Sequence, residues 1–149
     1  MPLALITGTR PHLGPAAATL GRAGFDVMTW AVGSPAPLTD TPYDCYVQLP
    51  CAGAATDLVC RTDTLAAVAS RLRPNASILL AVGEPESPGS RSATFASDLL
   101  ASVALALLED LGRPATRLAV FPLAAFAPVD AVLDLTQWEM PTPPLVSAP

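Results

Sequence analysis

The sequence predicts a single α/β domain built on a mainly parallel sheet of five or six strands. Short apolar runs alternate with longer helix-compatible segments through most of the 149 residues, which favours βαβ units with right-handed crossovers. The run Ser77–Val82 is short and apolar, as expected for a parallel strand that helices cover on both faces. A chain of this length is typical of one domain, which we place at residues 1–139.

Each expected strand is a run of apolar and β-forming residues bounded by a glycine, a proline or a loop. In chain order, these strands are Pro2–Thr7, Phe25–Val32, Tyr43–Leu49, Ser77–Val82, Arg117–Leu123 and a last edge strand, Val132–Thr136. The segments between them have either helical periodicity or the composition of a loop. The expected helices are Leu13–Ala23, Ala55–Leu72 and Ser92–Leu111, and the expected loops include Gly33–Pro42 and Glu84–Gly89.

Glycine and proline mark the ends of several of these elements. Gly24 and Gly112 follow the first and third helices, where glycine commonly ends a helix. Pro74–Asn75 is expected to separate the second helix from the strand that follows it. From Met140 onward the chain is rich in proline, and we expect this tail, residues 140–149, to be extended or disordered.

The long helix Ser92–Leu111 is apolar around nearly its whole circumference. A helix of this kind must be covered on more than one side. The sheet covers one side. In the interpretation we prefer, a second subunit covers the other side of the helix. In the alternative, the C-terminal segment covers it. The sequence therefore favours a homodimer or a hetero-oligomer formed through this helix.

Charge and hydropathy exclude several classes of partner. The net charge is −5, and the eight basic residues, all arginines, are scattered singly. Because there is no basic stripe, nucleic acid is not an expected partner. The most apolar stretch, Leu99–Leu108, is too short to span a bilayer, which takes about 20 residues. The N-terminus lacks the basic segment and the cleavage site of a signal peptide, so we expect a cytoplasmic protein without a membrane partner.

Two residue types limit the possible chemistry. The three cysteines, Cys45, Cys51 and Cys60, form no CxxC pair, and we expect buried free thiols rather than a disulfide or a metal site. The chain contains no lysine. A Walker A phosphate loop, a Schiff base and a Tyr–Lys acid pair are therefore impossible within this polypeptide.

The first strand leads into a turn that contains glycine. Residues 4–14 have the sequence ALITGTRPHLG, which resembles the strand, TGxxxGxG motif and helix at the start of short-chain dehydrogenases/reductases. Thr7, Gly8 and Gly14 match the motif, and His12 replaces its middle glycine. In that family the glycines let the backbone approach the pyrophosphate of NAD(P) at the helix N-terminus. The alternative is an ordinary tight turn without a ligand. The resemblance implies a vestigial NAD(P) site at Gly8, Thr9, Arg10 and Gly14.

Three later segments strengthen the resemblance, which extends over residues 4–120. Residues 44–53 are similar to the family's strand that ends in NNAG, and residues 76–83 to its strand that ends on the catalytic serine. Residues 92–112 are similar to its helix that carries YxxxK. The resemblance implies a Rossmann-like sheet. Between Trp30 and Tyr43 the family has a helix, a strand and a second helix, whereas this chain has only a Pro-rich loop. We therefore expect one αβα segment at the sheet edge to be missing.

The resemblance also implies which chemistry is lost. Gly83 stands at the family's serine position, and Ser92 and Ala96 stand at its tyrosine and lysine positions. The tyrosine acts as an acid only with the help of the lysine, so we expect no catalytic residues. The preferred hypothesis is a non-catalytic subunit that pairs through Ser92–Leu111 with its own copy or with an active reductase of the family.

The alternative hypothesis is a small enzyme or ligand-binding domain that uses the cleft at the strand ends. His12 is a candidate base there, oriented by Asp40 or Asp44, and Glu84 with Glu86 is a candidate carboxylate pair. The alternative for His12 is a surface or capping residue, and the alternative for the two glutamates is a solvated turn. A further possibility is a sensor that binds a dinucleotide without reacting it, and Trp30 would then lie near the adenosine. The expected contacts of the cleft are Thr9, Arg10, His12, Gly83, Glu84 and Ser92.

Overall fold

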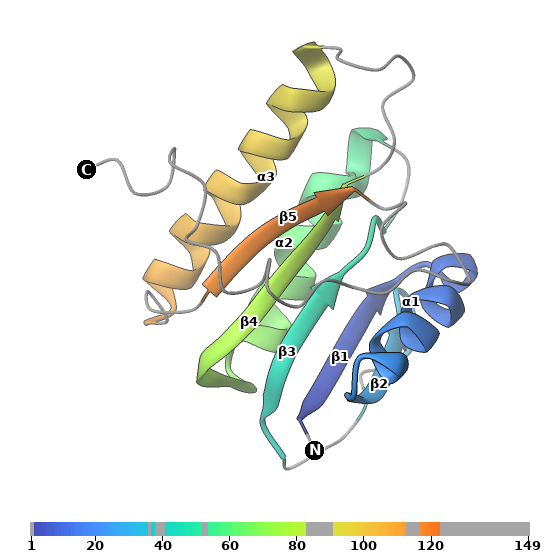
Figure 1. Cartoon of the computed structure of the whole chain (residues 1–149). Helices are drawn as coiled ribbons and strands as arrows, with labels where there is room; N and C mark the ends of the chain where they lie inside the picture. The colour runs from blue at the N-terminus through green and yellow to red at the C-terminus, as the bar shows by residue number, and fades with distance from the viewer. Residues whose placement is uncertain are drawn as a thin grey trace.

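The described part of the chain folds into a five-stranded parallel sheet with helices on both faces (Figure 1). The computed structural model describes residues 2–35, 37, 41–51, 54–82, 91–112 and 117–122, with side chains at all of these except 54–56, 91–98 and 121–122. Strands and helices alternate except between the second and third strands. In chain order the elements are β1 (Leu3–Gly8), α1 (Arg10–Arg22), β2 (Asp26–Ala31), β3 (Tyr43–Gln48), α2 (Ala54–Ala69), β4 (Leu72–Val82), α3 (Arg91–Asp110) and β5 (Arg117–Pro122).

The strand order is β2-β1-β3-β4-β5. It reverses between β1 and β3, because the chain moves outward from β1 to β2 and then returns past β1 to build the rest of the sheet. Right-handed crossovers then place α1 on one face and α2 with α3 on the other, as Figure 1 shows. The carboxyl ends of β1 and β3 meet at this reversal, which is where open parallel sheets bind their ligands.

Two apolar layers hold the helices against the sheet. Alternate residues of each strand point to opposite faces, so that Ile6 faces α1 while Leu5 faces α2 and α3. A row of paired residues crosses the whole sheet on the face of α2 and α3, in the order Met28, Leu5, Tyr46, Ile78 and Leu118. All of these except Met28 are almost completely buried. The expected α/β class with a parallel sheet of five strands is confirmed.

The start of β4 corrects one expectation. Pro74–Asn75 does not separate α2 from β4 but lies within β4, which begins at Leu72. The pairing with β3 is irregular there, since Tyr43 pairs with Leu72 whereas Cys45 pairs with Ser77. Proline is tolerated at such an irregularity because the ladder does not require its missing N–H. Arg73, just before the proline, forms an ion pair of 2.7 Å with Asp44.

The start of α1 also differs from the expectation. The helix begins at Arg10, three residues before the predicted Leu13. Thr9 occupies the N-cap position, and Pro11 stands in the first turn, where the fixed φ of proline suits a helix and its missing N–H costs nothing. The chain therefore passes from β1 into α1 through Thr9 alone.

The long helix α3 agrees closely with its predicted bounds. Leu100, Ala101, Ala104 and Leu108 are buried, whereas Leu99 and Leu111 are 38% and 45% exposed. No helix in the described part of the chain combines the length and the hydropathy needed to span a bilayer. The predicted strand Val132–Thr136, the loop Glu84–Gly89 and the tail 140–149 lie outside the described residues.

Candidate functional site

The predicted dinucleotide motif forms the turn between β1 and α1. Thr9 has an extended backbone (φ −82°, ψ 148°), and its side chain makes no capping hydrogen bond. Arg10 and Gly14 are exposed on the first turns of α1, and His12 is partly buried. Gly8 thus ends β1, Thr9 follows it, and Arg10 and Gly14 lie in the first turns of α1. Binding of NAD(P) at this turn stays a prediction.

The two matching glycines have different structural roles. A Cβ atom on Gly8 would lie 2.7 Å from the Cβ of Leu49, which is closer than two carbon atoms approach without displacement. Gly8 is therefore required by the close packing of β1 against the end of β3. A Cβ atom on Gly14 would meet no atom within 4 Å, so protein packing does not require glycine there.

The predicted catalytic use of His12 with Asp44 is wrong. Asp44 lies near the amino end of β3, where its carboxylate accepts a hydrogen bond of 2.8 Å from the backbone N–H of Leu3 and pairs with Arg73. His12 follows the opposite, carboxyl end of β1, and the strand between spans about 20 Å. Asp40, Gly83, Glu84 and Glu86 lie outside the described residues, as does the side chain of Ser92.

A buried polar network joins the carboxyl ends of β1 and β3 to α2. Thr7 of β1 shares a hydrogen bond of 2.6 Å with the hydroxyl of Tyr46, which accepts a second bond of 3.1 Å from the amide of Gln48. The same amide donates to the backbone carbonyl of Arg61 at 2.8 Å. Arg61 returns two bonds of 3.0 Å, one to the side-chain oxygen of Gln48 and one to its carbonyl.

The charge of Arg61 is balanced from its own helix. The carboxylate of Asp57, one turn earlier, lies 3.5 Å from the guanidinium and also accepts a hydrogen bond of 2.8 Å from the backbone N–H of Cys51. Desolvation by burial lowers the pKa of Arg61, and Asp57 opposes this shift. Arginine remains charged in proteins. The network therefore contains a buried cation between the sheet and α2, paired with a carboxylate that is 24% exposed. Burial raises the pKa of the Tyr46 phenol above its ordinary value, which keeps Tyr46 neutral.

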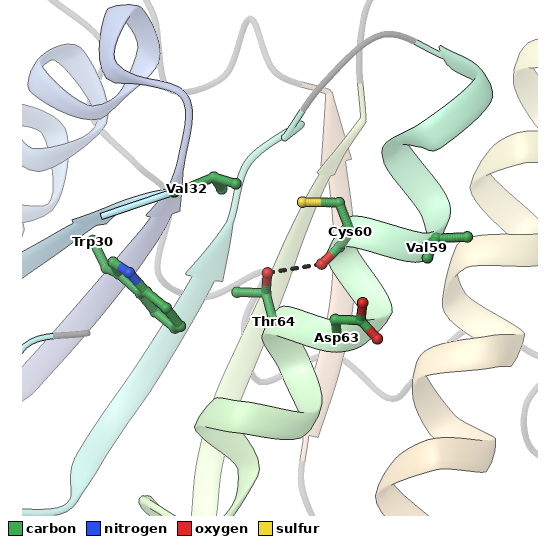
Figure 2. A pocket seen from close by; sticks show the side chains of 7 residues that line it. Trp30, Val32, Val59, Cys60, Asp63 and Thr64 are labelled. Atoms are coloured by element: carbon green, nitrogen blue, oxygen red, sulfur yellow. Dashed lines mark hydrogen bonds between the residues drawn. The ribbon is translucent and has the colours of Figure 1, made fainter. Parts of the chain in front are cut away.

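Beside this network lies a pocket of about 570 Å³ (Figure 2). One wall is the carboxyl end of β2 and the turn after it, and the other is the exposed side of α2. Pockets of 300–1,000 Å³ are typical of small-molecule sites. The lining residues are Trp30, Val32, Gly33, Val59, Cys60, Asp63 and Thr64.

The side chains of the pocket are held in place by the protein. The indole N–H of Trp30 donates to the backbone carbonyl of Ser34 at 2.8 Å, which fixes the ring. The hydroxyl of Thr64 donates to the carbonyl of Cys60 at 2.7 Å. Figure 2 shows the methyl group of Thr64 on the side of Trp30 and the sulfur of Cys60 directed across the pocket toward Val32. The described lining is therefore mainly apolar, with the thiol of Cys60 on one wall and the carboxylate of Asp63 exposed on α2.

The three cysteines are free thiols with different surroundings. Burial raises the pKa of Cys45 above its ordinary range, and Asp44 adds to this shift. Burial likewise raises the pKa of Cys51 to about 12, and the nearby thiol of Cys60 adds to it. Cys60 itself is partly exposed and lines the pocket. Among the described residues, no three His, Cys, Asp or Glu side chains form a group that could hold a metal ion.

The chain was compared with protein-family models, curated proteins and solved structures, and nothing matched. The sequence motifs predict a site at the turn between β1 and α1 and do not indicate the pocket wall on α2. Trp30 was expected beside a ligand and lines the pocket. The network was not predicted, although Gln48 in an apolar strand, and Asp57 four residues before Arg61 on a helix, are visible in the sequence.

Proposed function

We propose that this chain is a small-molecule-binding domain without chemistry of its own, and that its ligand occupies the pocket between β2 and α2. The observation that carries the proposal is a pocket of about 570 Å³ with fixed walls. It lies near the reversal of strand order, the usual ligand site of open parallel sheets. Ligand binding is the alternative hypothesis of the sequence analysis. The site proposed for it here is the pocket between β2 and α2, not the turn between β1 and α1.

The absence of chemistry is supported by the residues around the pocket. Its titratable side chains among the described residues are Cys60 and Asp63. The thiol of Cys60 has the buried thiol of Cys51 beside it, and neither ion pair of the described side chains involves Asp63. The chain has no lysine, so the acid pair of the dehydrogenases it resembles is unavailable from this polypeptide. A pocket without a reactive pair fits a sensor or a carrier.

A screen of a fragment collection that includes NADH and NADPH, followed by ligand-observed NMR, tests the proposal. Val32→Phe should fill the pocket, because Val32 is 38% exposed and borders it. Ala18→Phe is the control, since Ala18 is exposed on α1, on the other face of the sheet. We expect binders whose signals are lost with Val32→Phe and retained with Ala18→Phe. If no fragment binds, or if Val32→Phe binds as the native chain does, the proposal fails.

A second candidate function is the non-catalytic subunit that the dehydrogenase resemblance implies. The observation that favours it is the exposure of Leu99 (38%) and Leu111 (45%) on α3, the helix expected to pair with a second chain. In this account the partner is a second copy or an active reductase of that family. The residues that line the pocket differ from the exposed leucines of the α3 region, so the two functions are compatible.

A further inference from the structure

The walls of the pocket restrict the chemistry of its ligand, and this inference rests on the proposed function. The indole of Trp30 lines the pocket on the side of β2. Its N–H is already bonded to Ser34. The hydroxyl of Thr64 is likewise bonded within α2, which leaves its methyl group toward Trp30. These walls therefore favour a ligand with a flat apolar ring that stacks on the indole.

The charges around the pocket restrict the ligand further. Among the described residues that line the pocket, Asp63 is the one charged side chain. It is exposed at the rim of α2, and neither ion pair found among the described side chains involves it. The described lining residues include no arginine or histidine. An anionic ligand would meet this carboxylate without a compensating cation, whereas a basic nitrogen at the rim would be attracted by it.

The nearest basic residue on α2 does not change this conclusion. Arg61 is next to Cys60 in the chain, but its guanidinium faces the sheet and is 2% exposed. It is bound to Gln48 and Asp57, so a phosphate in the pocket could not recruit it without breaking the network. The net charge of the chain, −5, acts in the same direction.

We infer that the pocket takes a flat aromatic ligand that is uncharged or carries a basic nitrogen, and that it rejects phosphorylated and other anionic ligands. A dinucleotide that binds this chain must therefore place its phosphates elsewhere than between Trp30 and α2.

Two related dyes separate the inference from the proposed function. N-phenyl-1-naphthylamine is uncharged, and 8-anilino-1-naphthalenesulfonate carries the same rings with an added sulfonate. Both accept excitation energy from tryptophan. In a Trp138→Phe background, Trp30 is the single tryptophan, so quenching of its emission reports binding nearby. We expect the uncharged dye to bind at least ten times more tightly than the sulfonate.

Charge variants identify the cause of the discrimination. Asp63→Asn should reduce the ratio of the dissociation constant of the sulfonate dye to that of the uncharged dye by about threefold or more. Asp110→Asn removes the same charge from the exposed end of α3 and should leave their ratio unchanged. Equal affinities, or a ratio that Asp63→Asn does not alter, would overturn the inference while leaving the proposed function standing. Failure of both dyes to quench Trp30 would count against the pocket itself and thus against both.

Discussion

Gln48 and Arg61 hold each other through three hydrogen bonds, two donated by the guanidinium and one donated by the glutamine amide to the arginine backbone. Gln48 ends β3, and Arg61 lies in the middle of α2. Each residue satisfies polar groups of the other that burial removes from water. The pair therefore fixes α2, the helix that forms one wall of the pocket, against the sheet.

The first prediction concerns the coupling of this pair. Gln48→Leu should lower the free energy of unfolding by about 2–3 kcal/mol, because it leaves the Nε–H of a buried guanidinium and the backbone carbonyl of Arg61 without their side-chain partner. Arg61→Met should cost a similar amount, since it leaves Gln48 and Asp57 without their partner. The double variant should be less destabilised than the sum of the two, by about 1 kcal/mol or more. Urea unfolding of the four proteins measures this, and simple additivity would show that the residues are not coupled.

The second prediction contrasts the two glycines of the β1–α1 motif. Gly8→Ala should destabilise the protein by about 1–3 kcal/mol, because its Cβ would overlap that of Leu49. Gly14→Ala should stabilise it by up to about 1 kcal/mol, because alanine is the better residue in an exposed helix interior. Thermal unfolding of both variants and of the native chain, without ligand, measures the two changes in stability. Destabilisation by Gly14→Ala would contradict the open space at this position.

The third prediction concerns thiol reactivity. A thiolate is the reactive form of cysteine, and burial raises the pKa of Cys51 to about 12 and that of Cys45 above its ordinary range. At pH 8 a disulfide reagent should therefore react quickly with Cys60 alone. Cys60→Ser should abolish the fast reaction, and denaturant should expose all three thiols. Fast labelling of Cys45 or Cys51 in the native protein would contradict their burial.

The fourth prediction is a loss of stability at alkaline pH. The folded state raises the pKa of Cys45 and Cys51 above the unfolded value of about 8.5. Their contribution to stability is therefore full below pH 8.5 and declines as the pH rises toward the folded pKa. The slope is up to about 1.4 kcal/mol per pH unit for each thiol. Between pH 8 and 10.5, urea unfolding should show that the free energy of unfolding declines less steeply in Cys51→Ala than in the native chain. An equal slope would contradict the contribution of Cys51.

The fifth prediction tests subunit pairing through α3. If this helix meets a second copy, Leu99→Glu should convert a dimer into a monomer of 15.3 kDa, because it places a charge in an apolar contact. Ala18→Glu is the control, since Ala18 is exposed on α1 on the other face of the sheet. Light scattering coupled to size-exclusion chromatography gives the mass. If the native chain is already a monomer, α3 does not pair with a second copy, and the remaining possibility for this helix is a different partner chain.

The fold was largely predictable because its signals are local. Alternating apolar strands and helices determine the class, and glycine ends α1 and α3 with positive φ at Gly24 (+100°) and Gly112 (+77°). The errors arose where tertiary context overrides a local signal. Pro74 normally interrupts a strand, yet an irregular register with β3 accommodates it within β4. Asp44 was paired with His12 in the hypothesis, although parallel strand direction separates them.

The candidate site was less predictable for a physical reason. The motif around Gly8 is contiguous in sequence, so it can be recognised, whereas the pocket joins Trp30 to α2 residues about 30 positions later. Periodicity indicates which side of a helix is apolar but not which strand it faces. The burial of Arg61 could not be predicted from the sequence, because its partners come from β3 as well as from its own helix.

The most direct test of the account is a map of amide chemical shifts in the Trp138→Phe protein during titration with N-phenyl-1-naphthylamine. The single indole N–H resonance, that of Trp30, should shift together with the backbone amides of Val32, Gly33, Cys60 and Thr64. Shifts confined to α3 or to the turn at Thr9, or no shifts at all, would contradict a ligand site between β2 and α2.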